Sequence, residues 1–87
     1  MSASNTTTDH QEIRNWVEAR QGHPARVKGR EPGGILRIDF GEPEESLEKI
    51  SWDKFFEIFD ENKLAFLYQE KTDDGRTSRF SKFVARH

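Results

Sequence analysis

Residues 51–70, SWDKFFEIFDENKLAFLYQE, contain the clearest helix signal of the chain and, directly after it, the clearest strand signal. Four aromatic residues recur at the i, i+3, i+4 and i+7 spacing of an amphipathic helix: Trp52, Phe55, Phe56 and Phe59. Ser51 is a good N-cap, and Asn62 is expected to end the helix in a left-handed conformation. The apolar run at 64–70 has no helix breaker and predicts a largely buried strand.

A second helix is predicted from about residue 10 to residue 21. Asp9 is its expected N-cap, with Glu12 in the capping-box position. Its apolar face and the arginine stem that extends it are formed by Ile13, Trp16, Val17 and Arg20. Gly22 is the expected left-handed residue after the helix, and Pro24 prevents its continuation.

Two hairpins are predicted, one after each helix. Residues 25–28 and 35–40 alternate between apolar and charged side chains on either side of the Gly-rich turn at 29–34. The second hairpin turns at Asp73-Asp74-Gly75, with the glycine in the left-handed position.

The last segment leaves two alternatives open. Residues 76–80 indicate the return strand of the second hairpin, but Phe80, Phe83 and Val84 follow helical spacing. A bulge near Ser81 or a terminal helical turn would each explain this spacing. We favour a strand with an irregularity.

The expected order is therefore α-β-β-α-β-β, in an α+β fold with one antiparallel sheet of about four strands and both helices on one face. Residues 1–8 are small and polar and predict a disordered tail, which leaves 9–87 as one domain. The acidic segment 41–48 predicts a solvated loop with a helical turn near 46–49. One contiguous core is expected from Trp16, Leu36, Ile38, Phe40, Trp52, Phe55, Phe56, Phe59 and Phe66.

Residue types needed for most catalytic and metal sites are missing or wrongly spaced. The chain has no Cys, which excludes a disulfide, a thiolate zinc site and a Cys nucleophile. The three histidines, His10, His23 and His87, lack the spacing of a helical metal site. There is no phosphate-binding loop, EF-hand loop or nucleophile elbow. We therefore expect no cofactor, no metal and no enzymatic activity.

Charge is segregated along the chain although the net charge is only −2. Residues 20–38 carry five bases and one acid, residues 39–62 carry nine acids and two bases, and residues 63–87 carry six bases and three acids. On one four-stranded sheet, the bases of the two hairpins would share the face left open by the helices. The residues expected there, for phosphate or partner binding, are Arg26, Lys28, Arg37, Arg79 and Lys82.

Four stretches, HQEIRNWVEARQGHPARVKG, GILRIDF, ISWDKFFEIFDENKLAFLYQEK and SRFSKFVAR, resemble a group of small uncharacterised bacterial proteins. Members of that group often carry the label 1,4-α-glucan branching enzyme. Branching enzymes use a large β/α barrel, which 87 residues cannot form. The resemblance therefore implies a bacterial cytoplasmic protein and supplies no catalytic residues.

Three functional hypotheses follow. The first is a small non-catalytic binding or adaptor domain whose partner is another protein. The second is nucleic-acid binding through the basic face, and the third, implied only by the label, is a role in glucan metabolism. The first ten residues lack the basic start and apolar run of a signal or transit peptide, and no stretch approaches the roughly 18 apolar residues of a membrane span. We expect a cytoplasmic protein without membrane contact.

Overall fold

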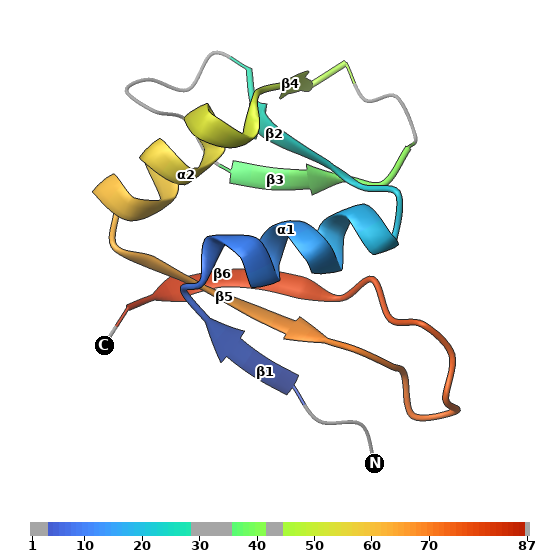
Figure 1. Ribbon diagram of the computed structural model, residues 1–87. Helices are drawn as coiled ribbons and strands as arrows, with labels where there is room; N and C mark the ends of the chain where they lie inside the picture. The colour runs from blue at the N-terminus through green and yellow to red at the C-terminus, as the bar shows by residue number, and fades with distance from the viewer. Residues whose placement is uncertain (1–3, 29–35, 42–44, 87) are drawn as a thin grey trace.

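The computed structural model describes residues 4–28, 36–41 and 45–86 (Figure 1). These ranges contain, in chain order, β1 (Ser4–Thr7), α1 (His10–Ala19), β2 (His23–Val27), β3 (Leu36–Asp39), β4 (Leu47–Lys49), α2 (Trp52–Glu61), β5 (Leu64–Gln69) and β6 (Ser81–Ala85). Some predicted features lie outside the described residues. They are the Gly-rich turn at 29–34, Glu42 and Glu44 of the acidic segment, and His87.

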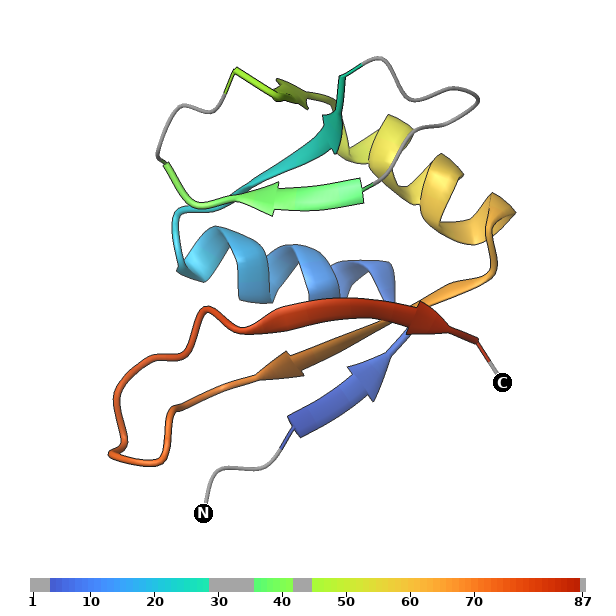
Figure 2. The same ribbon diagram turned by 180° about the vertical axis from the view of Figure 1, so that it is seen from behind.

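The described strands form two antiparallel sheets. Sheet A has the order β1-β5-β6, and sheet B has the order β3-β2-β4. Helix α1 lies between the sheets, and α2 crosses one end of the molecule (Figures 1 and 2). The α+β class is confirmed. The expected single sheet of about four strands is replaced by two three-stranded sheets, because α1 packs between the two hairpins instead of covering one face of both.

Two strands come from segments in which we expected no strand. Residues 4–7, expected in the disordered tail, form β1 and pair with β5 from Ser4 opposite Gln69 to Thr7 opposite Phe66. Residues 47–49, expected as loop or helical turn, form β4 and pair with β2. Both lie at sheet edges, and neither shows the apolar alternation by which a sequence reveals a strand.

Helix α1 begins as expected but ends differently. The side chain of Asp9 accepts a hydrogen bond from the backbone N–H of Glu12 at 3.0 Å. At the other end, the N–H of Gln21 donates to Glu18 and the N–H of Gly22 donates to Val17, which is the Schellman arrangement. The left-handed residue is Gln21, with φ of 61°, and not Gly22.

Gly22 has a different structural reason. A Cβ atom added there would lie 2.9 Å from Val17 Cγ1 and 3.0 Å from Ile38 Cγ2. The missing side chain therefore lets the end of α1 approach sheet B closely.

Helix α2 is capped as predicted at its start, where Ser51 Oγ accepts from the N–H of Lys54 at 3.1 Å. Its left-handed end residue is Lys63, with φ of 52°, whereas the expected Asn62 has φ of −92°. The buried face of α2 is Phe55, Ile58 and Phe59.

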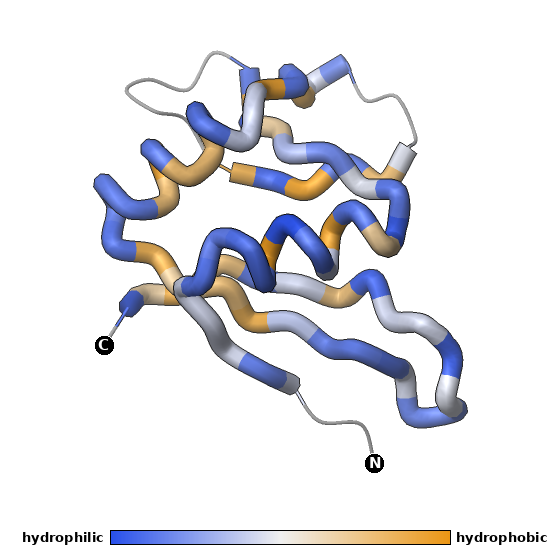
Figure 3. Tube along the Cα trace, viewed as in Figure 1, coloured by the Kyte–Doolittle hydropathy of each residue, from blue (hydrophilic) through white to orange (hydrophobic). Residues whose placement is uncertain are grey.

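The core joins both helices to both sheets. Its buried members are Ile13, Trp16, Val17, Leu36, Phe55, Ile58, Phe59, Phe66 and Tyr68. Every residue of the expected core belongs to this cluster or packs against it, but Ile38, Phe40, Trp52 and Phe56 are only partly buried. Phe56 stacks on the ring of His10, with centroids 4.0 Å apart. Figure 3 shows the hydrophobic residues gathered where the helices meet the sheets, whereas the connection between β5 and β6 is mostly hydrophilic.

The final segment is a strand that starts later than expected. A tight turn contains Gly75 with φ of 83°, as predicted, and an isolated bridge joins Lys71 to Thr77. Residues 78–80 are irregular, and β6 then pairs with β5 from Ser81 to Ala85. The favoured alternative, a strand with an irregularity, agrees with this arrangement.

Candidate functional site

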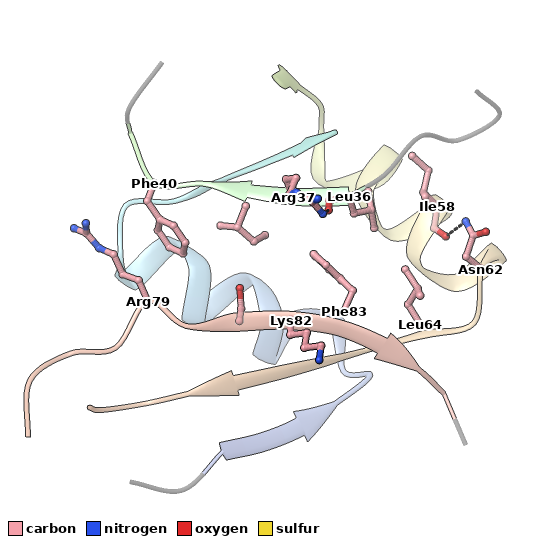
Figure 4. A pocket seen from close by; sticks show the side chains of 11 residues that line it. Leu36, Arg37, Phe40, Ile58, Asn62, Leu64, Arg79, Lys82 and Phe83 are labelled. Carbon is pink, nitrogen blue, oxygen red and sulfur yellow. Dashed lines mark hydrogen bonds between the residues drawn. The ribbon is translucent and has the colours of Figure 1, made fainter. Parts of the chain in front are cut away.

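A cavity of about 630 Å³ lies between the edge strands β3 and β6 (Figure 4). We call it the β3–β6 groove. Its described lining is made of Leu36, Arg37, Ile38, Phe40, Ile58, Asn62, Leu64, Arg79, Ser81, Lys82 and Phe83. The volume falls within the range of about 300–1,000 Å³ that is usual for ligand sites. Most of the lining is apolar, and none of the described lining residues is acidic.

The hydrophobic core supports this apolar lining. The Phe83 ring lies 5.5 Å from Phe66 and 5.9 Å from Phe55, measured between centroids. At the α2 end of the groove, Asn62 Nδ2 donates to the backbone carbonyl of Ile58 at 2.8 Å, the bond dashed in Figure 4. The groove is therefore a partly exposed extension of the core, formed where sheets A and B separate.

The edge of β6 presents backbone groups to the groove. Hydrogen-bonded and non-hydrogen-bonded pairs alternate along an antiparallel ladder. The backbone N–H of Gln69 donates to the carbonyl of Phe80, and the N–H of Arg86 donates to the carbonyl of Lys63. The backbone groups of every second residue from 80 to 86 therefore face β5. The backbone N–H and C=O groups that point away from β5 belong to Ser81, Phe83 and Ala85.

The edge of β3 is partly covered. Pro24 has no N–H, and its carbonyl points away from β3 and accepts from the N–H of Ile50. The Pro24–Ile38 pair is therefore non-hydrogen-bonded, so the backbone groups of Ile38 point away from β2, toward the groove. Next to it, Arg37 Nη1 donates to the carbonyl of Leu36 at 3.1 Å. This bond occupies one of the backbone acceptors on the β3 edge. The β6 edge is thus more accessible than the β3 edge.

Three of the five predicted basic residues converge on the groove. Arg37, Arg79 and Lys82 are all exposed and border it. The guanidinium of Arg79 lies 5.7 Å from the centroid of the Phe40 ring. In Figure 4, Arg79 lies beside Phe40 at one end of the groove, and the Lys82 side chain points away from the cavity.

The single basic face expected from the sequence is not formed. In the register of sheet B, Arg26 is opposite Leu36 and Arg37 is opposite Ala25. Because opposite residues of an antiparallel pair share a face, Arg26 and Arg37 project to different sides of the sheet. Arg26 also forms an ion pair with Glu48, with Nε and Oε1 2.5 Å apart. Lys28 is exposed and does not line the groove.

Arg20, predicted to extend a helical face and to belong to the basic segment 20–38, is instead bonded inside the folded domain. It is 8% exposed and donates to three backbone carbonyls, those of Trp16, Glu70 and Ser78, at 2.5–3.0 Å. Its guanidinium lies 4.3 Å from the centroid of the Trp16 ring. Burial lowers the pKa of Arg20, and the charge of Glu70 opposes that shift. Arg20 therefore fixes the β5–β6 connection to α1.

Tyr68 is also nearly buried and donates its hydroxyl hydrogen to Glu12, which also accepts a hydrogen bond from Thr7 at 3.0 Å. Burial, together with the hydrogen bond and charge of Glu12, raises the pKa of Tyr68 to about 12. Tyr68, Glu12 and Arg20 line a second cavity of about 490 Å³. Because these groups bind one another or the backbone, we interpret the shifted pKa values of Tyr68 and Arg20 as consequences of folding rather than signs of a reaction centre.

A third polar cluster joins both helices to the end of β6. Asp60 lies 2.9 Å from His10 Nε2 and 3.1 Å from Arg86 Nη2. Burial alone would raise the pKa of Asp60, but the hydrogen bonds and charges of His10 and Arg86 lower it. The cluster links residues far apart in the sequence, which is a structural role.

Compared with known proteins, the chain matches no protein-family model, no curated protein sequence and no solved structure. Among residues 4–28, 36–41 and 45–86, no group of three or more His, Asp or Glu could hold a metal ion. The two described helices are too short and too polar to span a membrane.

Proposed function

We propose that this protein is a non-catalytic binding domain for another protein and that the β3–β6 groove is its binding site. The observation that carries the proposal is the apolar groove, bordered by Arg37, Arg79 and Lys82 and without an acid in its described lining. Apolar surface supplies the free energy of association, and the cations select a partner of opposite charge. The occupant would therefore combine apolar and acidic side chains.

A peptide-display selection on the purified domain would test this proposal. The groove variant would carry Arg37→Glu, Arg79→Glu and Lys82→Glu, three substitutions at exposed positions. A control with the same change in net charge would carry Lys28→Glu, Lys54→Glu and Lys71→Glu, also at exposed positions outside the groove. Fluorescence anisotropy should show at least tenfold weaker binding of the selected peptides to the groove variant and little change for the control. Equal binding to both variants would contradict the proposal.

Nucleic-acid binding is a second candidate because of one specific observation. Phe80 is 49% exposed and lies in the chain between Arg79 and Lys82, so an aromatic ring is available for base stacking beside two cations. Single-stranded oligonucleotides should then bind at low salt and dissociate as salt rises. Phe80→Ala should weaken that binding. A soluble α-glucan in the same assay would test the role implied by the sequence resemblance.

A further inference from the structure

We infer that the partner binds as an extended segment that adds a strand to the free edge of β6, with alternating apolar and acidic side chains. This inference rests on the proposed function and specifies how the β3–β6 groove would be occupied. The backbone groups of Ser81, Phe83 and Ala85 point away from β5 and have no backbone partner among the described residues, and Ser81 and Phe83 line the groove. Strand addition uses such groups for affinity and the adjacent pockets for specificity.

Among the four edge strands of the described residues, β6 is the most suitable acceptor. β1 consists of the polar residues Ser-Asn-Thr-Thr, and β4 has only three residues. β3 borders the same groove, but Arg37 already donates to the Leu36 carbonyl on that edge. β6 has five residues, an apolar groove beside it and a neighbouring strand that fixes its position.

The register of β6 determines the side-chain pattern of its partner. The Phe83 side chain faces the core. Phe83 and Phe66 lie opposite each other as a non-hydrogen-bonded pair of the β5–β6 ladder. In an antiparallel addition, a residue that bonds to Phe83 would project its side chain to the same face, into the groove. These positions would be apolar, since Ile38, Phe40 and Leu64 line the cavity there.

The intervening residues of the added segment would project to the opposite face, where Lys82 lies in the same strand. An acidic side chain at these positions would complement Lys82. Arg37 and Arg79 at the groove border would attract further acids of the same segment. The charge of the described lining therefore favours an acidic segment over a neutral or basic one.

The alternation gives a test with an internal control. The probe is a seven-residue peptide of alternating Glu and Val, acetylated and amidated at its ends. Its Val N–H groups would point toward β6, and its Glu N–H groups would point away. N-methylation of two Val residues should weaken binding at least tenfold. N-methylation of two inner Glu residues should change binding less than threefold, although the two methylated peptides have the same composition and charge.

Amide hydrogen exchange of the complex gives an independent readout. On binding, the amides of Ser81, Phe83 and Ala85 should exchange more slowly. Those of Lys82 and Val84 should change little, because these residues already bond to β5. Failure of the Glu-Val peptide to bind at millimolar concentration, or equal binding of the two methylated peptides, would overturn strand addition. Selected peptides that still lose affinity for the groove variant would leave the proposed function intact, and binding of oligonucleotides alone would overturn both.

Discussion

Sheet A and sheet B both pack against α1, but they do so with different side chains. On sheet A, the Trp16 ring lies 5.5 Å from Phe66 and 5.7 Å from Tyr68, and its Nε1 donates to the carbonyl of Gln69 at 2.9 Å. On sheet B, Leu36 is the one large apolar side chain of the described residues that is buried.

This difference accounts for the position of the groove. Aromatic contacts and the hydrogen bonds of Arg20 and Tyr68 hold sheet A firmly. Ile38 in sheet B and Phe40, directly after β3, remain partly exposed where the sheets separate. A chain with 32% hydrophobic residues can bury one sheet well, and the apolar surface left over on the other becomes available for a partner.

The largest expected effect comes from a truncation on sheet A. Phe66→Ala should lower the free energy of unfolding by about 3–5 kcal/mol, because it leaves a cavity at a fully buried position. Ile38→Ala on sheet B should cost less than about 2 kcal/mol, since the side chain is only partly buried. Urea denaturation of both variants would measure the difference. Equal costs would mean that the two sheets are held equally firmly.

Arg20 offers a smaller and more local test of the same comparison. Arg20→Ala should cost about 2–3 kcal/mol, because three backbone carbonyls lose a charged donor. Hydrogen exchange should accelerate in the β5–β6 connection and not in sheet B. Arg20→Lys keeps the charge but loses the planar fork and should rescue only part of the stability. Uniform acceleration in both sheets would show that Arg20 acts globally.

The smallest effect concerns pH. The folded-state pKa of Tyr68, about 12, exceeds its ordinary value of 10.0. The neutral phenol therefore contributes stability that is complete below pH 10 and is lost as pH rises toward 12. Thermal melting between pH 9 and 12 should show this loss in the native protein. Tyr68→Phe should be somewhat less stable near pH 7 and should lose less over the alkaline range, whereas identical pH profiles would contradict the role of the hydroxyl.

Most elements could be predicted because their signals are local. The caps at Asp9 and Ser51 and the turn at Gly75 depend on nearby backbone geometry, and each lies where it was expected. The left-handed residues after the helices were predicted one position too late at Gly22 and one too early at Asn62, since Gln21 and Lys63 adopt this conformation without glycine's advantage. The two-sheet arrangement could not be predicted, because β1 and β4 carry no apolar periodicity and their pairing depends on distant strands.

The candidate site was predicted only in part for a related reason. Alternation suggested one outward face for Arg26 and Arg37, but the cross-strand register places them on opposite faces. Arg37, Arg79 and Lys82 meet only because β3 and β6 come from different sheets that border one groove. The sequence shows which residues are basic, whereas the position of Arg37, Arg79 and Lys82 around one groove depends on how the two sheets separate.

The pairing of β1 with β5 has a consequence for synthesis of the chain. The register joins Ser4 to Gln69, whereas all of sheet B lies within residues 23–49. Every strand of sheet B is synthesised before β5, and a longer loop also costs more chain entropy to close, by about 0.6 kcal/mol per doubling of its length. β1 therefore has no partner strand until β5 has been made. During that time its Ser, Asn and Thr side chains expose little apolar surface to other chains. In pulse-labelled refolding, the amide of Asn5, which faces Tyr68 of β5, should be protected after that of Ala25.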